Sequence, residues 1–188
     1  MISNQEKDVN EIRIRAKKIY QQGKNAVAQD DISKAILLFK NVIIELEKTP
    51  NDPPSVQDCR LMAKVRENLG QAYFITESYS DAIDNYFMAI LALEMIYRKT
   101  IEDHEQIIAL HQHLVNAHLL NNDIETATSC LKQKMLFEKE WRNLQQLTQL
   151  SSPSLIALTS RLFSFIKDEH NQSALEQSTS LHTLRRSQ

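Results

Sequence analysis

Apolar residues recur every three or four positions along most of the chain, which is the spacing of the buried face of an amphipathic α-helix. Short polar or proline-rich stretches interrupt the pattern, and between them it predicts helical hairpins at about 7–48, 55–99 and 101–147. A further helix is predicted at about 153–169. The tail at 171–188 is rich in Ser, Thr, Gln and His and has few large apolar residues, so we expect it to be disordered.

Residues that can accept a hydrogen bond from free backbone amides mark the predicted helix starts. Asp30 and Asp31 precede the second helix, and Ser152 with Pro153 opens the seventh. The fourth, fifth and sixth helices are preceded by segments that fit capping boxes, Ser78-x-x-Asp81, Thr100-x-x-Asp103 and Asn122-x-x-Glu125.

Three copies of one pattern align without internal gaps, at spacings of 47 and 45 residues. The corresponding positions are Gly23, Gly70 and Val115 in the first helices, and Ala35, Ala82 and Ala127 after the turns, followed by Phe39, Tyr86 and Leu131. Small residues opposite large ones allow two helices to cross closely. We therefore expect Gly70 and Ala82 to face each other. The additional residues at about 50–62 and 97–107 are predicted to lengthen the adjoining helices of successive hairpins by one or two turns.

The middle copy, with Leu69-Gly70, Tyr73, Ala82, Tyr86 and Ala89 at fixed spacings, resembles a tetratricopeptide repeat (TPR). That repeat is a 34-residue hairpin with the pattern W-x2-L-G-x2-Y followed by A-x3-F. The longer spacing is similar to the repeats of kinesin light chains and of LGN-type spindle-orientation adaptors. The resemblance covers about 12–144. It implies an all-α, TPR-like α-solenoid of three hairpins, and the helix at 153–169 is expected to cap its last apolar face.

The resemblance also implies a concave groove, lined by the first helix of each hairpin, in which such proteins hold a partner without chemistry of their own. The residues carried over to this groove and expected to bind the partner are Lys17, Tyr20, Gln21, Lys24, Lys64, Asn68, Gln71, Gln112, His113 and Asn116. The other carried-over positions hold Val27, Ala28, Glu67, Phe74, Ile75, Ala109, Leu119 and Leu120. Amide side chains both donate and accept hydrogen bonds, which suits the backbone of an extended peptide. We expect a non-catalytic module that binds a peptide or helical segment of a partner protein. The alternatives are a three-repeat secretion chaperone that holds an extended segment of a secreted client, and a merely solvated polar face.

Chaperone-binding members of the family use a clamp of lysine, asparagine and arginine side chains. The equivalent positions here hold Tyr20, Lys24, Asn68, Ala109 and His113, and only Asn68 matches. Binding of an Hsp70 or Hsp90 tail is therefore not expected.

Composition narrows the function classes further. The net charge of -2 provides no basic field for nucleic acid or an anionic membrane. No run approaches 18 apolar residues, and the N-terminus does not resemble a signal peptide. The two cysteines, Cys59 and Cys130, show no metal or redox spacing, which favours a cytoplasmic setting and leaves export by a specialised system open.

No catalytic motif is present, and with only two isolated glycines there is no phosphate-binding loop, so neither an enzyme nor a cofactor is expected. His104, His111 and His118 share one helix face, but their spacing of seven is too long for two ligands on one metal ion. His111 and His118 hold positions 4 and 11 of the repeat, which are aromatic core positions in the family, so the resemblance implies that both are core residues. Helical spacing predicts the same for Met88, Met95 and Met135.

Overall fold

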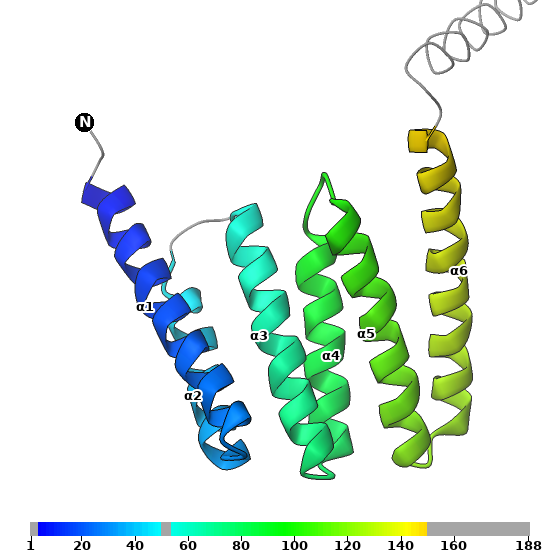
Figure 1. Cartoon of the computed structure of the whole chain (residues 1–188), viewed down its shortest axis with the longest axis horizontal. Helices are drawn as coiled ribbons and strands as arrows, with labels where there is room; N and C mark the ends of the chain where they lie inside the picture. Colours follow the sequence, from blue (N-terminus) through cyan, green and yellow to red (C-terminus); the bar gives the residue numbers. More distant parts are fainter. Residues whose placement is uncertain (1–3, 50–53, 150–188) are drawn as a thin grey trace, which may run out of the picture. The chain divides into compact units, whose positions relative to one another are not determined.

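The computed structural model describes residues 4–49 and 54–149, and these form helices without any strand. The elements are α1 (Asn4–Ala28), α2 (Ile32–Glu47), α3 (Val56–Ile75), α4 (Tyr79–Glu94), α5 (Ile101–Leu120) and α6 (Ile124–Gln149) (Figure 1). The all-α prediction is confirmed. The chain divides into two compact units, Met1–Lys139 and Glu140–Gln188, and the packing below is that of the first. The predicted capping helix at 153–169 and the tail at 171–188 lie outside the described residues, so both stay predictions.

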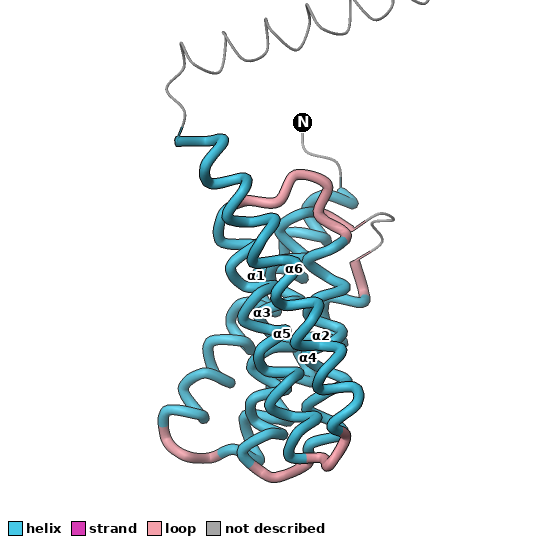
Figure 2. The backbone as a smooth tube through the Cα atoms, turned by 90° about the vertical axis from the view of Figure 1, so that its right-hand side faces the viewer, coloured by secondary structure: helices cyan, strands magenta, loops and turns pink. Residues whose placement is uncertain are grey.

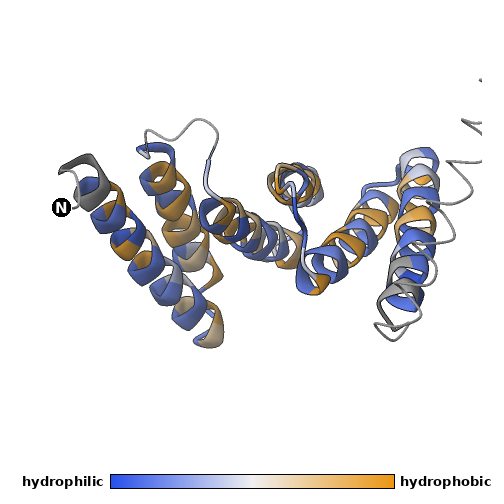
Figure 3. Ribbon diagram, turned by 90° about the horizontal axis from the view of Figure 1, so that it is seen from above, coloured by the Kyte–Doolittle hydropathy of each residue, from blue (hydrophilic) through white to orange (hydrophobic). Residues whose placement is uncertain are grey.

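Consecutive helices pack against one another from α1 to α5, and the closest pairs are α1 with α2 and α3 with α4. The first helices of successive hairpins also touch, α1 against α3 and α3 against α5. The connecting loops lie at the two ends of the helices (Figure 2). Apolar and polar positions alternate around the helices (Figure 3), and the buried apolar residues form one cluster centred on α2 and a second on α4 and α5.

The turns inside the three hairpins have the same geometry. Asp30, Glu77 and Asn122 occupy the same position of the pattern and all adopt φ of 60–61°, the left-handed region that non-glycine residues rarely enter. In each turn the next amide hydrogen-bonds the carbonyl five residues back at 2.9 Å, from Asp31 to Ala26, from Ser78 to Tyr73 and from Asp123 to His118. This recurrence confirms the gap-free alignment of the three copies.

Two of the three predicted capping boxes need correction. Thr100 and Asp103 form the expected reciprocal pair at the start of α5. Ser78 precedes α4, but its hydroxyl makes no capping bond. Asp31 has a similar backbone conformation and does accept from the amide of Lys34 at 3.1 Å, so the longer aspartate side chain reaches where the serine hydroxyl does not.

The start of α6 is the second correction. Asn122 takes the left-handed turn conformation, so the chain enters the helix one residue later than predicted. Asp123 caps α6 instead, accepting a hydrogen bond from the amide of Thr126 at 3.0 Å. Hydrogen bonds from the side chain and the backbone amide of Thr126 lower the pKa of Asp123 below its ordinary value.

Glycines at the helix crossings are covered by aromatic rings. A Cβ atom on Gly70 would lie 2.8 Å from the ring of Tyr86 and 3.2 Å from the carbonyl oxygen of Ala82, which confirms the predicted close approach. A Cβ atom on Gly23 would lie 2.6 Å from the ring of Phe39. Both rings are fully buried, and burial raises the pKa of Tyr86 to about 12.

The additional residues of the long repeats build a joint between neighbouring hairpins. Arg13 of α1 forms two parallel hydrogen bonds with Asp58 of α3, at 2.7 and 2.6 Å, and Arg60 of α3 repeats this arrangement with Asp103 of α5, at 2.8 and 2.7 Å. Each aspartate also hydrogen-bonds the residue that caps its own helix, Ser55 or Thr100. We call the two pairs the Arg–Asp joints.

The positions of the joints show which helices contain the residues that make each repeat longer than 34. Each joint aspartate lies five residues before the first position of its copy, in the early turns of α3 and α5. In contrast, α2 and α4 both end at position 32 of their copies, so the prediction that second helices also gain turns is wrong for these two. The added early turns of α3 and α5 therefore carry the carboxylate of each joint.

Candidate functional site

The predicted groove residues lie on the face that α1, α3 and α5 share, which we call the first-helix face. Across it, Asn68 of α3 donates a hydrogen bond to the hydroxyl of Tyr20 of α1 at 3.0 Å. Asn68 also donates to the carbonyl of Lys64 at 2.7 Å, so both hydrogens of its amide are used. Burial raises the pKa of Tyr20 above its ordinary value, which keeps its hydroxyl protonated.

Between α3 and α5 the face is linked by Glu67. Gln106 donates to its carboxylate at 2.6 Å, and the Nε2 atom of His113 lies 3.8 Å from the other oxygen. The His113 ring stacks on Tyr86, with ring centroids 5.0 Å apart. Gln106 was missed by the sequence analysis because it lies before the first position of the 34-residue pattern, in the lengthened part of α5.

The remaining predicted residues are more loosely held. Gln112 donates to Asn116 at 2.9 Å along α5, and Gln21 donates to Asn25 along α1 at 3.2 Å. Other polar members of the face are exposed, namely Lys17, Lys24, Lys64 and Gln71. The Lys24 ammonium lies 6.0 Å from the centroid of the Tyr20 ring. The structure therefore brings Tyr20 with Asn68 and Gln112 with Asn116 together, and leaves the lysines directed to solvent.

Near the turns, the same face is apolar. Each first helix ends with an exposed aliphatic side chain at position 12 or 13 of its copy, Val27 on α1, Ile75 on α3, and Leu119 and Leu120 on α5. Because α3 touches both α1 and α5, these positions recur along one side of the stack. The first-helix face thus combines an apolar edge with a hydrogen-bonded, lysine-bearing centre.

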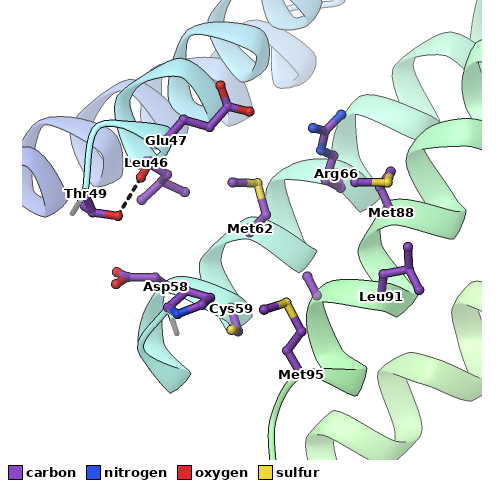
Figure 4. A pocket seen from close by; sticks show the side chains of 12 residues that line it. Leu46, Glu47, Thr49, Asp58, Cys59, Met62, Arg66, Met88, Leu91 and Met95 are labelled. Atoms are coloured by element: carbon purple, nitrogen blue, oxygen red, sulfur yellow. Dashed lines mark hydrogen bonds between the residues drawn. The ribbon is translucent and has the colours of Figure 1, made fainter. Parts of the chain in front are cut away.

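A second candidate surface is a hollow of about 340 Å³ between the end of α2, the first half of α3 and the outer side of α4 (Figure 4). Five of its twelve lining residues are methionines or leucines, among them Met62 from α3, Met88 and Leu91 from α4, and Met95 at the C-terminal cap of α4 (Figure 4). The prediction that Met88, Met95 and Met135 are core residues is wrong, because all three are exposed, Met95 by 60%.

The reason lies in α4, which carries two apolar stripes. Ala82, Tyr86, Ala89 and Leu93 form the buried stripe that closes the hairpin. Met88, Leu91 and Met95, spaced by three and four residues, form a second stripe. One apolar stripe is enough to pack α4 within its own hairpin. The second stripe was therefore the feature of the sequence that could have predicted this hollow.

The charged groups around the hollow differ in how they are satisfied. At one end, Asp58 is bonded to Arg13 and Ser55, and although burial alone would raise its pKa, these bonds hold it below the ordinary value. At the other end, the Nη1 atom of Arg66 donates to the amide oxygen of Asn85 at 3.1 Å. The buried Nε atom of Arg66 has no partner among the described residues. Burial lowers the pKa of Arg66, a sign that its charge is poorly solvated.

The remaining titratable candidates fit structural roles. His111 is buried and stacks on Phe137 of α6, with ring centroids 5.1 Å apart, and burial lowers its pKa. His118 is largely buried, with its Nδ1 atom 3.3 Å from the carboxylate of Asp123. The core interpretation of both is confirmed. Within residues 4–49 and 54–149, no three His, Cys, Asp or Glu side chains gather as a metal site would require. None of the described helices is long and apolar enough to cross a membrane.

Comparisons with known proteins identify the fold. No protein-family model matches the chain, and no curated protein matches it. Among solved structures it is similar to the N-terminal domain of stress-induced protein-1 (STI-1) from C. elegans. The TM-score is 0.53 at 16% sequence identity, and the match covers 71% of this chain and 97% of that one. At this identity the likeness shows the fold alone, a stack of helical hairpins of the TPR type.

Proposed function

We propose that this chain is a non-catalytic protein-binding module, and that a peptide or helical segment of a partner lies on the first-helix face. The observation that supports this most is the repeated exposure of aliphatic side chains at Val27, Ile75 and Leu119 beside a centre that carries Lys17, Lys24 and Lys64. Burial of such apolar surface by a partner is favourable by roughly 25 cal/mol per Å². The lysines would favour a segment of acidic character through charge complementarity.

The hydrogen bonds within the face fit this role. The Tyr20–Asn68 and Gln106–Glu67 bonds join neighbouring first helices, so the face needs little reordering when a partner binds. They also change which residues are expected to contact the partner. Asn68 has no free hydrogen to donate, whereas Gln71 and the lysines are exposed.

A binding role without catalysis is supported by the reactive groups that the structure describes. Burial raises the pKa of both Cys59 and Cys130, which keeps the thiols protonated and poorly nucleophilic. Both cysteines are free, in keeping with a cytoplasmic setting as part of the proposal. The early starts of α3 and α5 support the finer resemblance to the longer repeats of kinesin light chains and LGN-type adaptors.

The test is an affinity capture from the source cells followed by binding measurements on the captured partner segment. The double variant Ile75→Ser with Leu119→Ser should weaken binding about tenfold or more, since apolar anchors dominate most interfaces. The matched control is Leu37→Ser with Ile44→Ser, which changes two exposed aliphatic residues of α2 outside the face. If both double variants weaken binding equally, or if neither weakens it, the partner binds to a surface other than the first-helix face.

The secretion-chaperone alternative differs only in the partner. It predicts that the captured protein is a secreted client bound through an extended segment. A partner segment that becomes helical on binding, measured by circular dichroism, would contradict that alternative and leave the binding module in place.

A further inference from the structure

The geometry points to a second binding surface, at the hollow between α2, α3 and α4. We propose that its occupant is an amphipathic helix of a partner protein that inserts a bulky apolar side chain and places a carboxylate beside Arg66. This surface uses none of the residues of the first-helix face, so the inference does not depend on the function proposed above.

The apolar part of the hollow has the length and character for a helix. Met88 and Leu91 of α4 and Met95 at its C-terminal cap extend over two turns, about 10 Å at 1.5 Å per residue, which matches the i, i+3/i+4, i+7 anchors of a helix lying in a groove. Methionine side chains are flexible and polarizable, so they adapt to apolar groups of different shape. The hollow is small enough that one or two large side chains would fill it.

The polar groups of the wall argue for a helix rather than an extended strand. Asp58 is occupied by Arg13 and Ser55, and the hydroxyl of Thr49 donates to the carbonyl of Leu46 at 2.7 Å. An extended segment would bury backbone amides and carbonyls against a surface that offers them few partners. A helix satisfies those groups internally and presents only side chains.

Arg66 is the reason that the hollow favours an occupant with a negative charge. The Nη1 atom of Arg66 donates to the neutral amide of Asn85, and its Nε atom is buried without an acceptor. The carboxylate of Glu47, which also lines the hollow, partly supports the charge of Arg66, but no carboxylate among the described residues forms an ion pair with it. A buried donor without a partner is costly. A carboxylate from the occupant would compensate the charge of Arg66 by accepting a charge-assisted hydrogen bond from the terminal nitrogens of its guanidinium. The occupant is therefore acidic at one position next to its apolar anchors.

The experiment uses a display library of helix-forming peptides, selected on the full chain and counter-selected on the full-chain variant Leu91→Lys. Binding of the selected peptides is then followed by NMR of ¹³C-labelled methionine methyl groups. Met62, Met88 and Met95 report on the hollow, and Met135 on α6 is the internal control because it is exposed away from it. Circular dichroism and thermal unfolding establish that each variant is folded.

We expect the enriched peptides to share apolar residues at i, i+3 or i+4, and i+7 with a neighbouring Asp or Glu. They should shift the Met88 and Met95 methyl signals and leave Met135 unchanged. Replacing the peptide carboxylate by an amide should weaken binding about tenfold for the wild type and little for Arg66→Gln. This difference separates a paired carboxylate from a general effect of charge.

Three results would overturn the inference. The first is that no peptide is enriched over the counter-selection, or that the enriched peptides are extended or lack an acidic residue. The second is a concentration-dependent shift of Met88 and Met95 without peptide, which would identify a second copy as the occupant. The third is a shift of these signals in the peptide-free variant Leu158→Lys with Leu162→Lys, which would identify the chain's own C-terminal segment.

Discussion

The middle hairpin, α3 with α4, and the last, α5 with α6, begin from the same turn but cross in different ways. In the middle hairpin the ring of Tyr86 lies against Gly70 and is only 1% exposed. In the last, Val115 and Leu131 hold the equivalent positions, and Leu131 is 42% exposed. Here α6 contacts α5 further along, where Phe137 stacks on His111. All three hairpins share the turn, but close packing of the two helices along their length occurs in the hairpins that have the glycine–aromatic pair.

The neighbours of α5 extend the contrast. Its residues Ile107, Leu110 and Leu114 belong to the same buried cluster as Tyr86 and Leu93 of α4. Among the described residues of α6, Ala127 is the only buried apolar one. The first helix of the last hairpin is thus integrated into the middle one, while its second helix is held by fewer contacts.

The largest expected effect is at the crossing aromatic. Tyr86→Ala should lower the free energy of unfolding by about 3–5 kcal/mol, since it leaves a cavity at a fully buried site. Leu131→Ala at the equivalent position should cost under about 1 kcal/mol because much of that side chain already contacts water. Urea unfolding of both variants measures the difference. Equal costs would mean that the two crossings are energetically alike.

The Arg–Asp joint between the two hairpins comes next. Asp103→Asn should destabilise by about 1.5–3 kcal/mol, and a double-mutant cycle with Arg60→Gln should show that most of this is shared. The hydrogen bonds from Arg60 lower the pKa of Asp103 to about 2, so the folded state holds its proton less tightly than the unfolded state. The contribution of ionised Asp103 to the free energy of unfolding is fully present above the ordinary carboxyl pKa and is lost as the pH falls towards 2. An acid transition that is the same in wild type and Asp103→Asn would contradict this.

Replacing the glycine tests the crossing itself. Gly70→Ala should destabilise by about 1–2 kcal/mol through overpacking against Tyr86, although alanine favours a helix by about 1 kcal/mol relative to glycine. In the last hairpin, Leu131→Tyr should gain stability only in combination with Val115→Gly. The coupling, about 0.5–2 kcal/mol, is read from a double-mutant cycle of thermal unfolding. Strictly additive effects would show that the glycine–aromatic pair is not what brings the helices together.

The smallest expected effect concerns His111, which contacts α6. Burial lowers its pKa from 6.5 in the folded state, with the charge of Glu94 opposing the shift in part. Below pH 6.5 the unfolded chain therefore takes up the proton first, and stability falls until the pH reaches the lower folded pKa. The loss should stay under about 1 kcal/mol between pH 7 and 5.5 and be absent in His111→Gln. A variant with the same pH profile as the wild type would assign the loss to another group.

The hairpins themselves could be predicted because their signals are local. Asp30, Glu77 and Asn122 follow first helices of equal pattern, and Gly70 with Ala82 marks its own crossing. The all-α fold and the position of every turn follow from such spacings within one copy. Where local chemistry was judged by residue type alone, as at Ser78, the prediction failed because the reach of the side chain decides whether a cap forms.

Features between the hairpins could not be predicted in the same way. Arg13 and Asp58 are 45 residues apart, and the sequence around either residue does not indicate that the two form a pair. The polar positions of the first-helix face were located, but not that Asn68 would use its hydrogens on Tyr20 and Lys64. Met88 and Met95 share a helical spacing with the core, and only the arrangement of α2, α3 and α4 decides that they border a hollow.

The Arg–Asp joints also imply a rule for the order of the repeats. The middle copy carries both halves of a connector, Asp58 facing backwards along the array and Arg60 facing forwards. In the last copy, the place of the forward arginine, three residues before the first position, is held by Glu105. Tandem duplication of the middle copy would therefore lengthen the protein while every forward arginine still faces an aspartate of the next copy. A copy added after the last would meet two carboxylates, so growth by duplication is favoured inside the array and opposed at that end.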